Sequence, residues 1–356
     1  MNVLNKFFPR FIGIDIGSAS VKVVELARFG KKTVLKNYAH LESATYDGQP
    51  FRAFEKETLF LSSERAAEAI RACFDATEIH PQKVIFSLPD FSSFFVSFEL
   101  PPMTGSELTK AINFHASKYV PIPMSEIVLD WKKINPSGNR KEEKGEPLHI
   151  LAVAIPKKTM DQYRYVADLV GVSNFVLEPE AFSLFRIFSS QNGEALCVID
   201  FGAKSTTLSF GDKNGLQSSH SLDVSSDKIV KTLQEKAGLS PEEAMVLLKK
   251  EGLTGKQSEI QEIIISALTP MVSAFNESWQ SLKKKGNVVE KRPKILIVGG
   301  MALIPGLQEY LTGVMNAKVQ IGNPFTGLEY PNMLEPIIYE IGPSFSVAIG
   351  AARRVF

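Results

Sequence analysis

Cysteine is scarce in this chain, with two residues, Cys73 and Cys197, among 356. They stand far apart in the sequence, so they offer no disulfide framework and suit a reducing compartment such as the cytoplasm. An excess of one charge is also lacking, because 40 Lys and Arg residues balance 39 Asp and Glu residues to a net charge of +1. Such a chain has no global field that would attract nucleic acid, so we expect no nucleic-acid partner.

Long apolar runs are missing as well. No stretch approaches the roughly 20 apolar residues that a membrane-spanning helix needs. The first ten residues, MNVLNKFFPR, lack the apolar segment of a signal peptide. With 44% hydrophobic and 22% charged residues, the composition is that of a globular protein with room for two buried cores. The sequence therefore predicts a soluble protein of the cytoplasm.

Familiar catalytic motifs are absent too. The five histidines, at positions 40, 80, 115, 149 and 220, have no metal-ligand spacing. The chain contains no GxSxG nucleophile elbow, no GxxxxGK[ST] phosphate loop and no paired-cysteine motif. Nothing in the sequence thus indicates hydrolytic machinery, and no residue is singled out as catalytic.

What the chain does contain is one pattern written twice: a strand ending in aspartate, a glycine turn and a second strand. The two copies are FIGIDIGSASVKVVEL, residues 11–26, and CVIDFGAKSTTLSF, residues 197–210. Their alignment pairs Asp15 with Asp200, Gly17 with Gly202, and Ser20 with Ser205. The offset, 200 − 15 = 185 residues, is too long for a solenoid repeat. It suits two domain halves that each open with the same hairpin.

A turn of this kind directs backbone N–H groups and hydroxyls into one concavity, where they can hold phosphate oxygens. The predicted phosphate-binding residues are Asp15, Gly17, Ser18, Ser20 and Lys22 in the first copy, and Asp200, Gly202, Ser205, Thr206 and Thr207 in the second. Lys22 either reaches the phosphates as a point charge or is a solvent-facing strand lysine. The two aspartates are predicted to hold Mg²⁺ beside a polyphosphate, through water.

A third glycine turn lies in KILIVGGMALIPGLQEYL, residues 294–311. The segment reads as a buried strand, a turn at Gly299, Gly300 and Met301, and a helix. A helix that begins after glycine is a natural site for a phosphate or a ribose. The same glycines would also let the helix pack closely on the sheet, and the residues alone do not decide between these interpretations.

Two stretches separate these turns. Residues 94–171 read as strand, helix, strand, strand and helix, which predicts a small α+β module with a polar hairpin loop at 135–147. Residues 225–252 predict two helices, and residues 259–285 predict a long amphipathic helix that Pro270 kinks or divides.

The three glycine turns, in the order Asp15, Asp200 and Gly299–Gly300, resemble the phosphate-1, phosphate-2 and adenosine motifs of the actin-like ATPase superfamily. Within it the chain resembles the PilM family of type IV pilus assembly, which is itself similar to the division protein FtsA. The resemblance covers nearly the whole chain, and KYVPIPMSEIVLDW is its most specific segment. The other segments that carry it are GIDIGSASVKVVEL, VLEPEAFSLFR, VIDFGAKSTTLSF, GLSPEEAMVLLKK, GGMALIPGLQEYL, NPF at 323–325 and AIGAARR.

This resemblance implies a two-lobed α/β fold built from duplicated ribonuclease H-like domains, with an inserted α+β 1C subdomain of the SHS2 type. The implied domains are a first lobe core (1A) of residues 1–90, 173–192 and 345–356, an inserted 1C subdomain of residues 91–172, a second lobe core (2A) of residues 193–222 and 293–344, and a helical 2B insert of residues 223–292.

The resemblance also implies a function. It predicts ATP with Mg²⁺ between the lobes, and a partner, the short cytoplasmic N-terminal tail of a PilN-like single-span membrane protein. The chain would then lie in the cytoplasm at the inner membrane, held there only through that partner. The family pattern is interrupted by His115, Met301, Ala274 and Glu277, of which the last three fall near the expected ribose and base. We therefore expect ATP binding with weak or no turnover.

Three alternatives share the superfamily: an active ATPase or small-molecule kinase, an FtsA-like division protein, and a type II secretion protein. A sugar kinase would need a catalytic base beside a sugar pocket, and no residue stands out for that role. FtsA anchors itself through a C-terminal amphipathic helix that this sequence lacks. The sequence leaves open whether the chain forms homo-oligomers.

Overall fold

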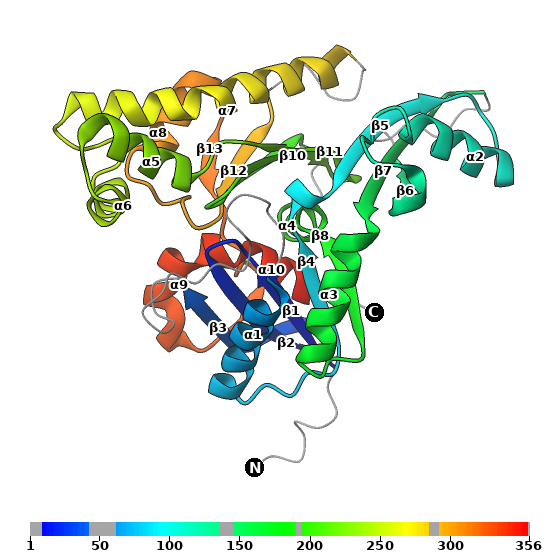
Figure 1. Ribbon diagram of the computed structural model, residues 1–356, viewed down its shortest axis with the longest axis horizontal. Helices are drawn as coiled ribbons and strands as arrows, with labels where there is room; N and C mark the ends of the chain where they lie inside the picture. The colour runs from blue at the N-terminus through cyan, green and yellow to red at the C-terminus, as the bar shows by residue number, and fades with distance from the viewer. Residues whose placement is uncertain (1–8, 43–61, 135–144, 190–193, 285–291, 355–356) are drawn as a thin grey trace. The chain divides into compact units, whose positions relative to one another are not determined.

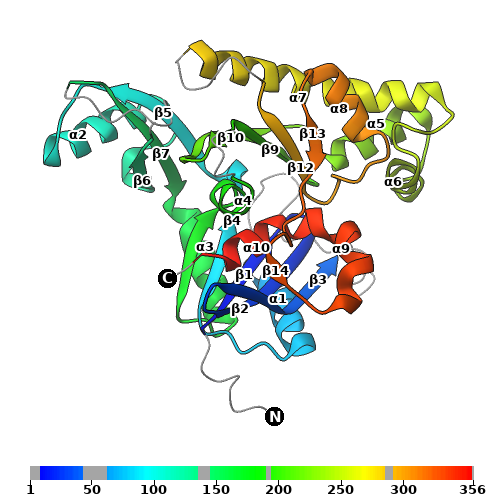
Figure 2. The same cartoon turned by 180° about the vertical axis from the view of Figure 1, so that it is seen from behind.

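The computed structural model describes residues 9–42, 62–134, 145–189, 194–284 and 292–354. Its contacts divide the chain into two compact units. The first unit consists of Met1–Ser92, Pro156–Phe188 and Asn323–Phe356, and the second of Ser93–Ile155 and Ser189–Gly322. Figures 1 and 2 together label the helices and strands of both.

A six-stranded sheet forms the centre of the first unit, in the order β14-β3-β2-β1-β4-β8. Strands β1, β2 and β3 are antiparallel neighbours, whereas β1, β4 and β8 run parallel. The strands are β1 (Arg10–Ile16), β2 (Ser20–Phe29), β3 (Lys32–Glu42), β4 (Val84–Leu88), β8 (Phe175–Pro179) and β14 (Leu328–Glu329).

The second unit has a five-stranded sheet in the order β11-β10-β9-β12-β13. Strands β9, β10 and β11 are antiparallel, and β9, β12 and β13 are parallel. The strands are β9 (Leu196–Phe201), β10 (Thr206–Asp212), β11 (Gly215–Leu222), β12 (Lys294–Val298) and β13 (Val319–Ile321). This repeats the order and the strand directions of β3-β2-β1-β4-β8, so the predicted duplication is confirmed.

Helices cover both faces of the first sheet. Figure 1 shows α1 and α3 in front of it, and Figure 2 shows α10 against the opposite face. The helices are α1 (Ser63–Thr77), α3 (Lys157–Leu169), α4 (Glu180–Phe188), α9 (Glu335–Ile341) and α10 (Ser346–Ala352). Every residue of α10 is buried, which makes this helix part of the core.

The helices of the second unit that lie outside its insert pack over one apolar core. They are α5 (Ser226–Ala237), α6 (Pro241–Lys250), α7 (Ser258–Lys284) and α8 (Leu307–Met315). Ser240 and Glu243 form a capping box that fixes the start of α6, as its serine and proline predict. Helix α7 continues through Pro270 as one element, because its apolar stripe on both sides of the proline is buried in the core.

The insert in the second unit is a small α+β module. Its three-stranded sheet has the order β5-β7-β6, and α2 packs beside β5. The elements are β5 (Phe94–Leu100), α2 (Gly105–Ala116), β6 (Ile127–Lys133) and β7 (Leu148–Pro156). Strand β5 lies beside β11 of the five-stranded sheet. Residues 135–144 of the predicted hairpin loop lie outside the described residues.

The expected four domains stay a prediction, and two segments of the chain lie in a different compact unit from the one that their expected domain suggests. Helix α3, expected in the insert, packs against α1 in the first unit, where Tyr163 contacts Phe86. Residues 323–344, expected in the second lobe, also belong to the first unit. There Phe325 and Ile338 join the apolar cluster of β2 and β3. Both placements depend on apolar contacts that local sequence patterns do not reveal.

Candidate functional site

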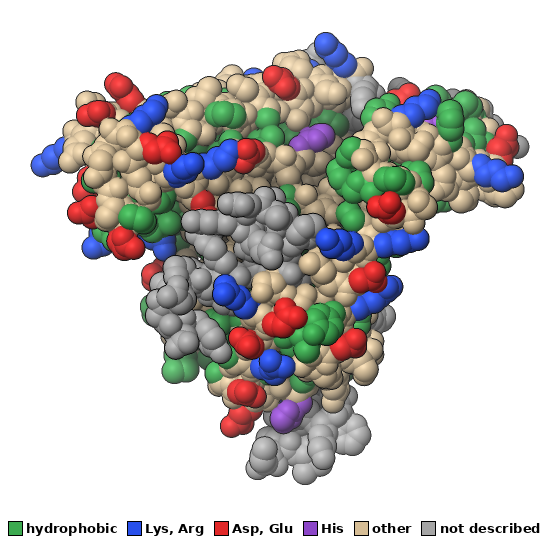
Figure 3. Space-filling model, viewed as in Figure 1, with side chains coloured by type: hydrophobic (Ala, Val, Ile, Leu, Met, Phe, Trp, Pro, Cys, Tyr) green, Lys and Arg blue, Asp and Glu red, His purple; other side chains and the backbone are tan. Residues whose placement is uncertain are grey.

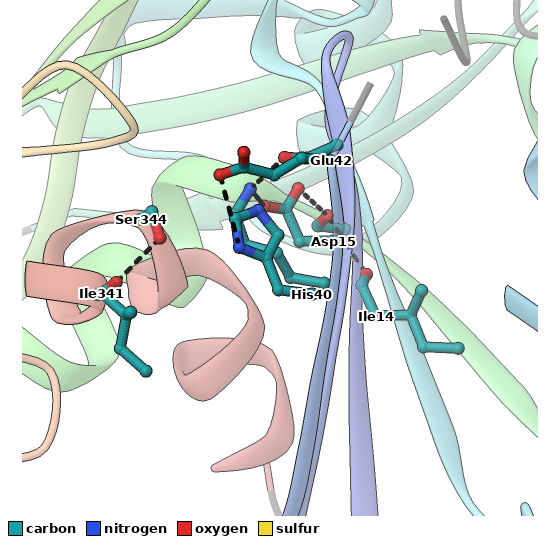
Figure 4. A network of polar contacts seen from close by, with 9 residues as sticks. Ile14, Asp15, His40, Glu42, Ile341 and Ser344 are labelled. Carbon is teal, nitrogen blue, oxygen red and sulfur yellow. Dashed lines mark hydrogen bonds and ion pairs between the residues drawn. The ribbon is translucent and has the colours of Figure 1, made fainter. Parts of the chain in front are cut away.

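A row of polar side chains crosses the first sheet at the end of β1. Strand register places Asp15 opposite Lys22 and Lys22 opposite His40, so the three share one face. The Lys22 Nζ lies 3.4 Å from the Asp15 Oδ2 and donates a 2.8 Å hydrogen bond to the Ser20 Oγ. Figure 4 shows Asp15 on β1 beside His40 on β3. The sequence had placed Asp15, Ser20 and Lys22 together, and the structure brings them together.

Burial distinguishes the two interpretations of Lys22. The residue is 7% exposed and Asp15 is 5% exposed, so the charged pair lies largely out of water. Lys22 is therefore not a solvent-facing strand lysine. A cation held beside a buried carboxylate at a glycine turn is suited to neutralising a bound phosphate.

The rest of the first turn is tightly built. A side chain at Gly17 would place its Cβ 3.1 Å from the Ser20 carbonyl oxygen, so the turn favours glycine there. Ser18 is buried beside it. His40 completes the row, and its Nδ1 is 3.7 Å from the Glu42 Oε1 (Figure 4). The His40 ring packs edge-on against Phe345, with centroids 5.6 Å apart.

The second turn has the same backbone plan with different side chains. The Gly202 N–H donates a 3.1 Å hydrogen bond to the Ser205 carbonyl, which closes the turn after Asp200. Thr207 lies opposite Asp200, as Lys22 lies opposite Asp15, and the offset 207 − 22 = 185 matches that of the aspartates. The position opposite the aspartate therefore holds a threonine in the second repeat, where the first repeat has a lysine.

Thr206 is turned to the other side of the sheet. Its hydroxyl donates a 2.8 Å hydrogen bond to the Val224 carbonyl, and its strand partner is Phe201, not Asp200. Thr207, one residue on, shares the face of Asp200, and its Oγ1 is 3.2 Å from the Ser221 Oγ. Thr206 was predicted to face a phosphate, but the alternation of side chains along β10 directs its hydroxyl away from Asp200.

The third turn abuts the second. Gly299 has φ +90°, and a Cβ there would lie 2.4 Å from the Asp200 Oδ1. Glycine thus allows the β12 turn to approach the aspartate closely. Met301 is buried in the apolar core and its N–H donates a 3.3 Å hydrogen bond to the Phe201 carbonyl. Helix α8 begins only at Leu307, so Gly300 precedes a loop and not the helix directly.

The two residues of α7 that break the family pattern also have defined positions. Ala274 packs half-buried against the core, and Glu277 is exposed. A separate hollow of about 390 Å³ opens between α7 and α8. Its wall consists of Leu253, Thr254, Gln261, Ile265, Gly306, Glu309 and Tyr310, none of which was predicted as a site residue.

Sequence reasoning missed three polar residues at this edge of the first sheet. The Ser87 hydroxyl, at the end of β4, lies 3.3 Å from the Asp15 Oδ1. Asp90 and Glu180 are linked by a 3.4 Å hydrogen bond from the Asp90 N–H to the Glu180 Oε2. A serine inside the apolar strand KVIFSLP was the available signal for Ser87. Asp90 and Glu180 follow β4 and β8, whose carboxyl ends meet where a ligand binds in an open α/β sheet.

The described residues contain no cluster of three or more His, Cys, Asp or Glu side chains arranged around a metal. Magnesium does not require such a cage, because it is commonly bound by one or two carboxylates together with phosphates and water. A carboxylate at the end of a strand and beside a glycine turn, as Asp15 is in the first unit and Asp200 in the second, has the chemistry of such a ligand. In the parts of the chain that the structure describes, no helix has the length and apolar character needed to cross a bilayer.

Comparison with known proteins gives a consistent result. A family model described as type IV pilus assembly protein PilM matches residues 13–356. A solved PilM-PilN type IV pilus biogenesis complex contains a chain with a TM-score of 0.80 and 20% identity, covering 96% of this chain and 97% of that one. The cell division protein FtsA of Streptococcus pneumoniae is 22% identical over 350 residues, covering 88% of this chain and 75% of its own length.

The fold is shared more widely. MreB5 of Spiroplasma citri, solved with bound AMPPNP, matches with a TM-score of 0.54 and 12% identity over 96% of this chain and 94% of its own. These similarities confirm the predicted class, an α/β actin-like ATPase fold.

Proposed function

Because this chain belongs to the family of type IV pilus assembly proteins PilM, we propose that it is a nucleotide-binding scaffold of that assembly. In this proposal Asp15 and Asp200 hold ATP with Mg²⁺, and the insert docks the cytoplasmic N-terminal tail of a PilN-like inner-membrane protein. The solved PilM-PilN complex and the AMPPNP-bound MreB5 support the two halves of the proposal. The protein would lie in the cytoplasm and reach the inner membrane through its partner.

The observation that carries nucleotide binding is the repeated topology. Asp15 and Asp200 end equivalent strands, β1 and β9, and each is followed by a glycine turn. Lys22 supplies the positive charge of the first turn, and the backbone N–H groups of both turns supply hydrogen bonds to phosphate. Bound Mg²⁺ would neutralise phosphate charge, and the two carboxylates would position it through its water ligands.

We propose a structural role for the nucleotide rather than rapid turnover. The phosphate turns are complete, whereas Ala274 and Glu277 replace the family's polar pair on α7. A ligand that binds one arrangement of the chain better than another shifts the population toward that arrangement. ATP would therefore select the form of the protein that assembles with its partner. Steady-state ADP release above about one per second, in the ordinary enzyme range, would instead indicate an active ATPase.

Replacing either aspartate is expected to weaken Mg-ATP binding. Asp15→Asn and Asp200→Asn each remove a carboxylate charge while keeping the size of the side chain. We expect the affinity for Mg-ATP, measured by titration calorimetry, to fall by about tenfold or more in each variant. The control is Asp161→Asn, which changes an exposed aspartate of α3 that pairs with Arg164 at the surface, 2.9 Å away. Wild-type affinity in all three variants would contradict the assigned site.

The partner surface is assigned to exposed apolar side chains of the insert. Phe114 and Tyr119 are 63% and 61% exposed, and Val128 on β6 is 39% exposed. The Lys118 ammonium lies 4.5 Å from the centroid of the Phe114 ring. Figure 3 shows hydrophobic side chains on the surface of this module. Exposed aromatic side chains are frequent anchors for a peptide.

Phe114→Ala is expected to weaken binding of a synthetic PilN-type tail peptide. Removal of an aromatic anchor should lower the affinity by about fivefold or more, measured by fluorescence anisotropy with and without Mg-ATP. Tyr339→Ala provides the matched control, because Tyr339 on α9 is 69% exposed and lies outside the insert. The docking proposal fails if the wild-type protein binds no peptide in either state. If both variants lost the same peptide affinity, the binding surface would not be specific to α2.

A further inference from the structure

A lysine of the insert reaches the β10–β11 hairpin of the five-stranded sheet. Along β6, Leu129 and Trp131 pack in the apolar cluster that the insert shares with α2, so Lys132 lies on the opposite face of the three-stranded sheet. The Lys132 Nζ lies 3.2 Å from the position that a Cβ would take at Gly215, the first residue of β11. Strand β5 of the insert lies beside the same strand. Insert and hairpin both belong to the second unit, and Lys132 is a contact between them.

A buried carboxylate lies at the same turn of the hairpin. Asp212 ends β10, pairs with Gly215 across the turn and is 9% exposed. Its Oδ1 accepts a 2.7 Å hydrogen bond from the Asn214 N–H, and its Oδ2 accepts a 3.1 Å hydrogen bond from the Gln217 Nε2. These two donors are neutral amides, so they orient the carboxylate without supplying a positive charge.

Burial makes these two charges costly to separate. It lowers the pKa of Lys132 and raises that of Asp212, and the charge of each residue opposes the shift of the other. Lys213, in the turn itself, also acts on the carboxylate, but Lys132 is the cation that the insert supplies. A buried charge that loses its partner is strongly destabilising. Displacement of the insert from the hairpin is therefore disfavoured.

The face of the insert that carries Lys132 also carries part of the assigned partner surface. Val128 lies four residues earlier on β6, on the same face, and is 39% exposed. Four strand residues span about 13 Å, so a peptide bound at Val128 lies within reach of the hairpin. Strand β10 also pairs with β9, the strand that carries Asp200. The hairpin is thus continuous with the second glycine turn and borders the partner surface.

We propose that Lys132 is a positioning residue, whose charge beside Asp212 holds the insert on the β10–β11 hairpin in the orientation that binds the partner peptide. The anchoring follows from contacts within the second unit alone. Its effect on partner binding rests on the proposed function, because it needs a peptide on the insert. Loss of the anchor should leave the insert folded, because its apolar cluster lies on the other face of its sheet.

Spin labels on the full chain measure the anchoring directly. Thr109→Cys on α2 and Gln280→Cys on α7 place one label on the insert and one on the helices of the same unit, both at exposed positions. The native Cys73 and Cys197 are buried, and burial raises the pKa of both thiols, so they should remain unlabelled.

Double electron–electron resonance should give a narrow distribution of label distances when Lys132 and Asp212 are intact. We expect Lys132→Met and Asp212→Asn each to make the distribution about twice as wide, because the insert is then free to turn on the hairpin. Lys133→Met is the matched control, since Lys133 follows on the same strand and is exposed. Its distribution should match that of the wild type.

Peptide binding tests the consequence of the anchoring. Lys132→Met and Asp212→Asn should each weaken binding of the synthetic PilN-type tail peptide by about fivefold, measured by fluorescence anisotropy. The double variant should lose no more than either single variant, because both substitutions remove the same pair. Lys133→Met should bind the peptide as the wild type does.

Three results would overturn the inference. The first is a distance distribution that stays equally narrow in Lys132→Met and Asp212→Asn. The second is an unchanged peptide affinity in both variants, and the third is a double variant whose loss is the product of the single losses, as expected of two independent structural roles. If the wild-type chain binds no peptide, the proposed partner fails, while the distance measurement still decides whether Lys132 anchors the insert.

Discussion

Glu178→Ala is expected to lower the free energy of unfolding by about 3 kcal/mol. Glu178 lies near the end of β8 and is 3% exposed. Three side chains donate hydrogen bonds to its carboxylate. Arg186 donates to the Oε2 at 2.6 Å, Arg354 donates to the same oxygen, and the Ser183 hydroxyl donates to the Oε1 at 2.8 Å. Alanine would leave two guanidinium groups without their acceptor. This expected loss is at the lower end of the range for breaking a buried ion pair, because both arginine side chains are partly exposed.

The loss of the Glu178 carboxylate should affect several elements, because its hydrogen-bond network extends beyond β8. Arg186 also donates a 2.7 Å hydrogen bond to the Gly350 carbonyl of α10. One carboxylate therefore connects β8, α4 and the end of α10. Urea unfolding should be followed by circular dichroism, because both tryptophans, Trp131 and Trp279, lie in the second unit and would not report the first.

Asp161→Ala is the matched control for that measurement. Asp161 pairs with Arg164 on the exposed face of α3, where both side chains are more than half exposed. Surface pairs of this kind contribute about 0–1 kcal/mol, so the unfolding midpoint should hardly move. If Glu178→Ala and Asp161→Ala lower the free energy of unfolding by the same amount, the carboxylate of Glu178 is not the centre of a stabilising network.

The same network shows which features of the fold the sequence predicts. The segments VLEPEAFSLFR and AIGAARR carried part of the family resemblance without any assigned role. In the structure they meet, since Glu178 and Arg186 belong to the first and Arg354 to the second. Their residues stabilise the packing of α4 and α10 on the sheet. Local patterns predict each element, but not that two motifs far apart in the chain share one carboxylate.

The candidate site divides in the same way. The aspartates, the glycines and Lys22 could be predicted because the repeat lies in the sequence itself. Ser87 and Glu180 could not, because each reaches this edge from a different element through the order of the strands. Thr206 shows a second limit of the sequence pattern. It lies in the predicted segment, but side chains alternate along a strand, and its hydroxyl lies on the face opposite Asp200.

The repeat also shows where the two turns have diverged. Equivalent positions hold Lys22 in the first and Thr207 in the second, beside equivalent aspartates. The position opposite the aspartate thus holds a buried lysine in the first repeat and a threonine in the second.

Gly13→Ala is expected to displace α10 and to cost about 3 kcal/mol or more, at the upper end for an overpacked core. Gly13 lies in the middle of β1, on the same face as Asp15. A Cβ there would lie 2.0 Å from the Ala348 carbonyl oxygen and 2.6 Å from the Ala352 nitrogen. Both atoms are helix backbone, so no side-chain rotation relieves the overlap. Helix α10 cannot retreat easily, because Gly350 on its other side meets the Ser183 backbone equally closely.

Gly313→Ala gives this experiment a control of opposite sign. Gly313 lies inside α8, its added Cβ would meet no atom within 4 Å, and the residue is exposed. Alanine there should stabilise the chain by about 0.5–1 kcal/mol through helix propensity alone. The urea midpoints of unfolding of the two glycine variants, followed by circular dichroism, should therefore shift in opposite directions.

Because α10 covers the face that carries Asp15 and Lys22, Gly13→Ala should also weaken Mg-ATP binding, whereas Gly313→Ala should leave it unchanged. A Gly13→Ala protein of wild-type stability would show that α10 does not approach β1 as closely as the structure has it.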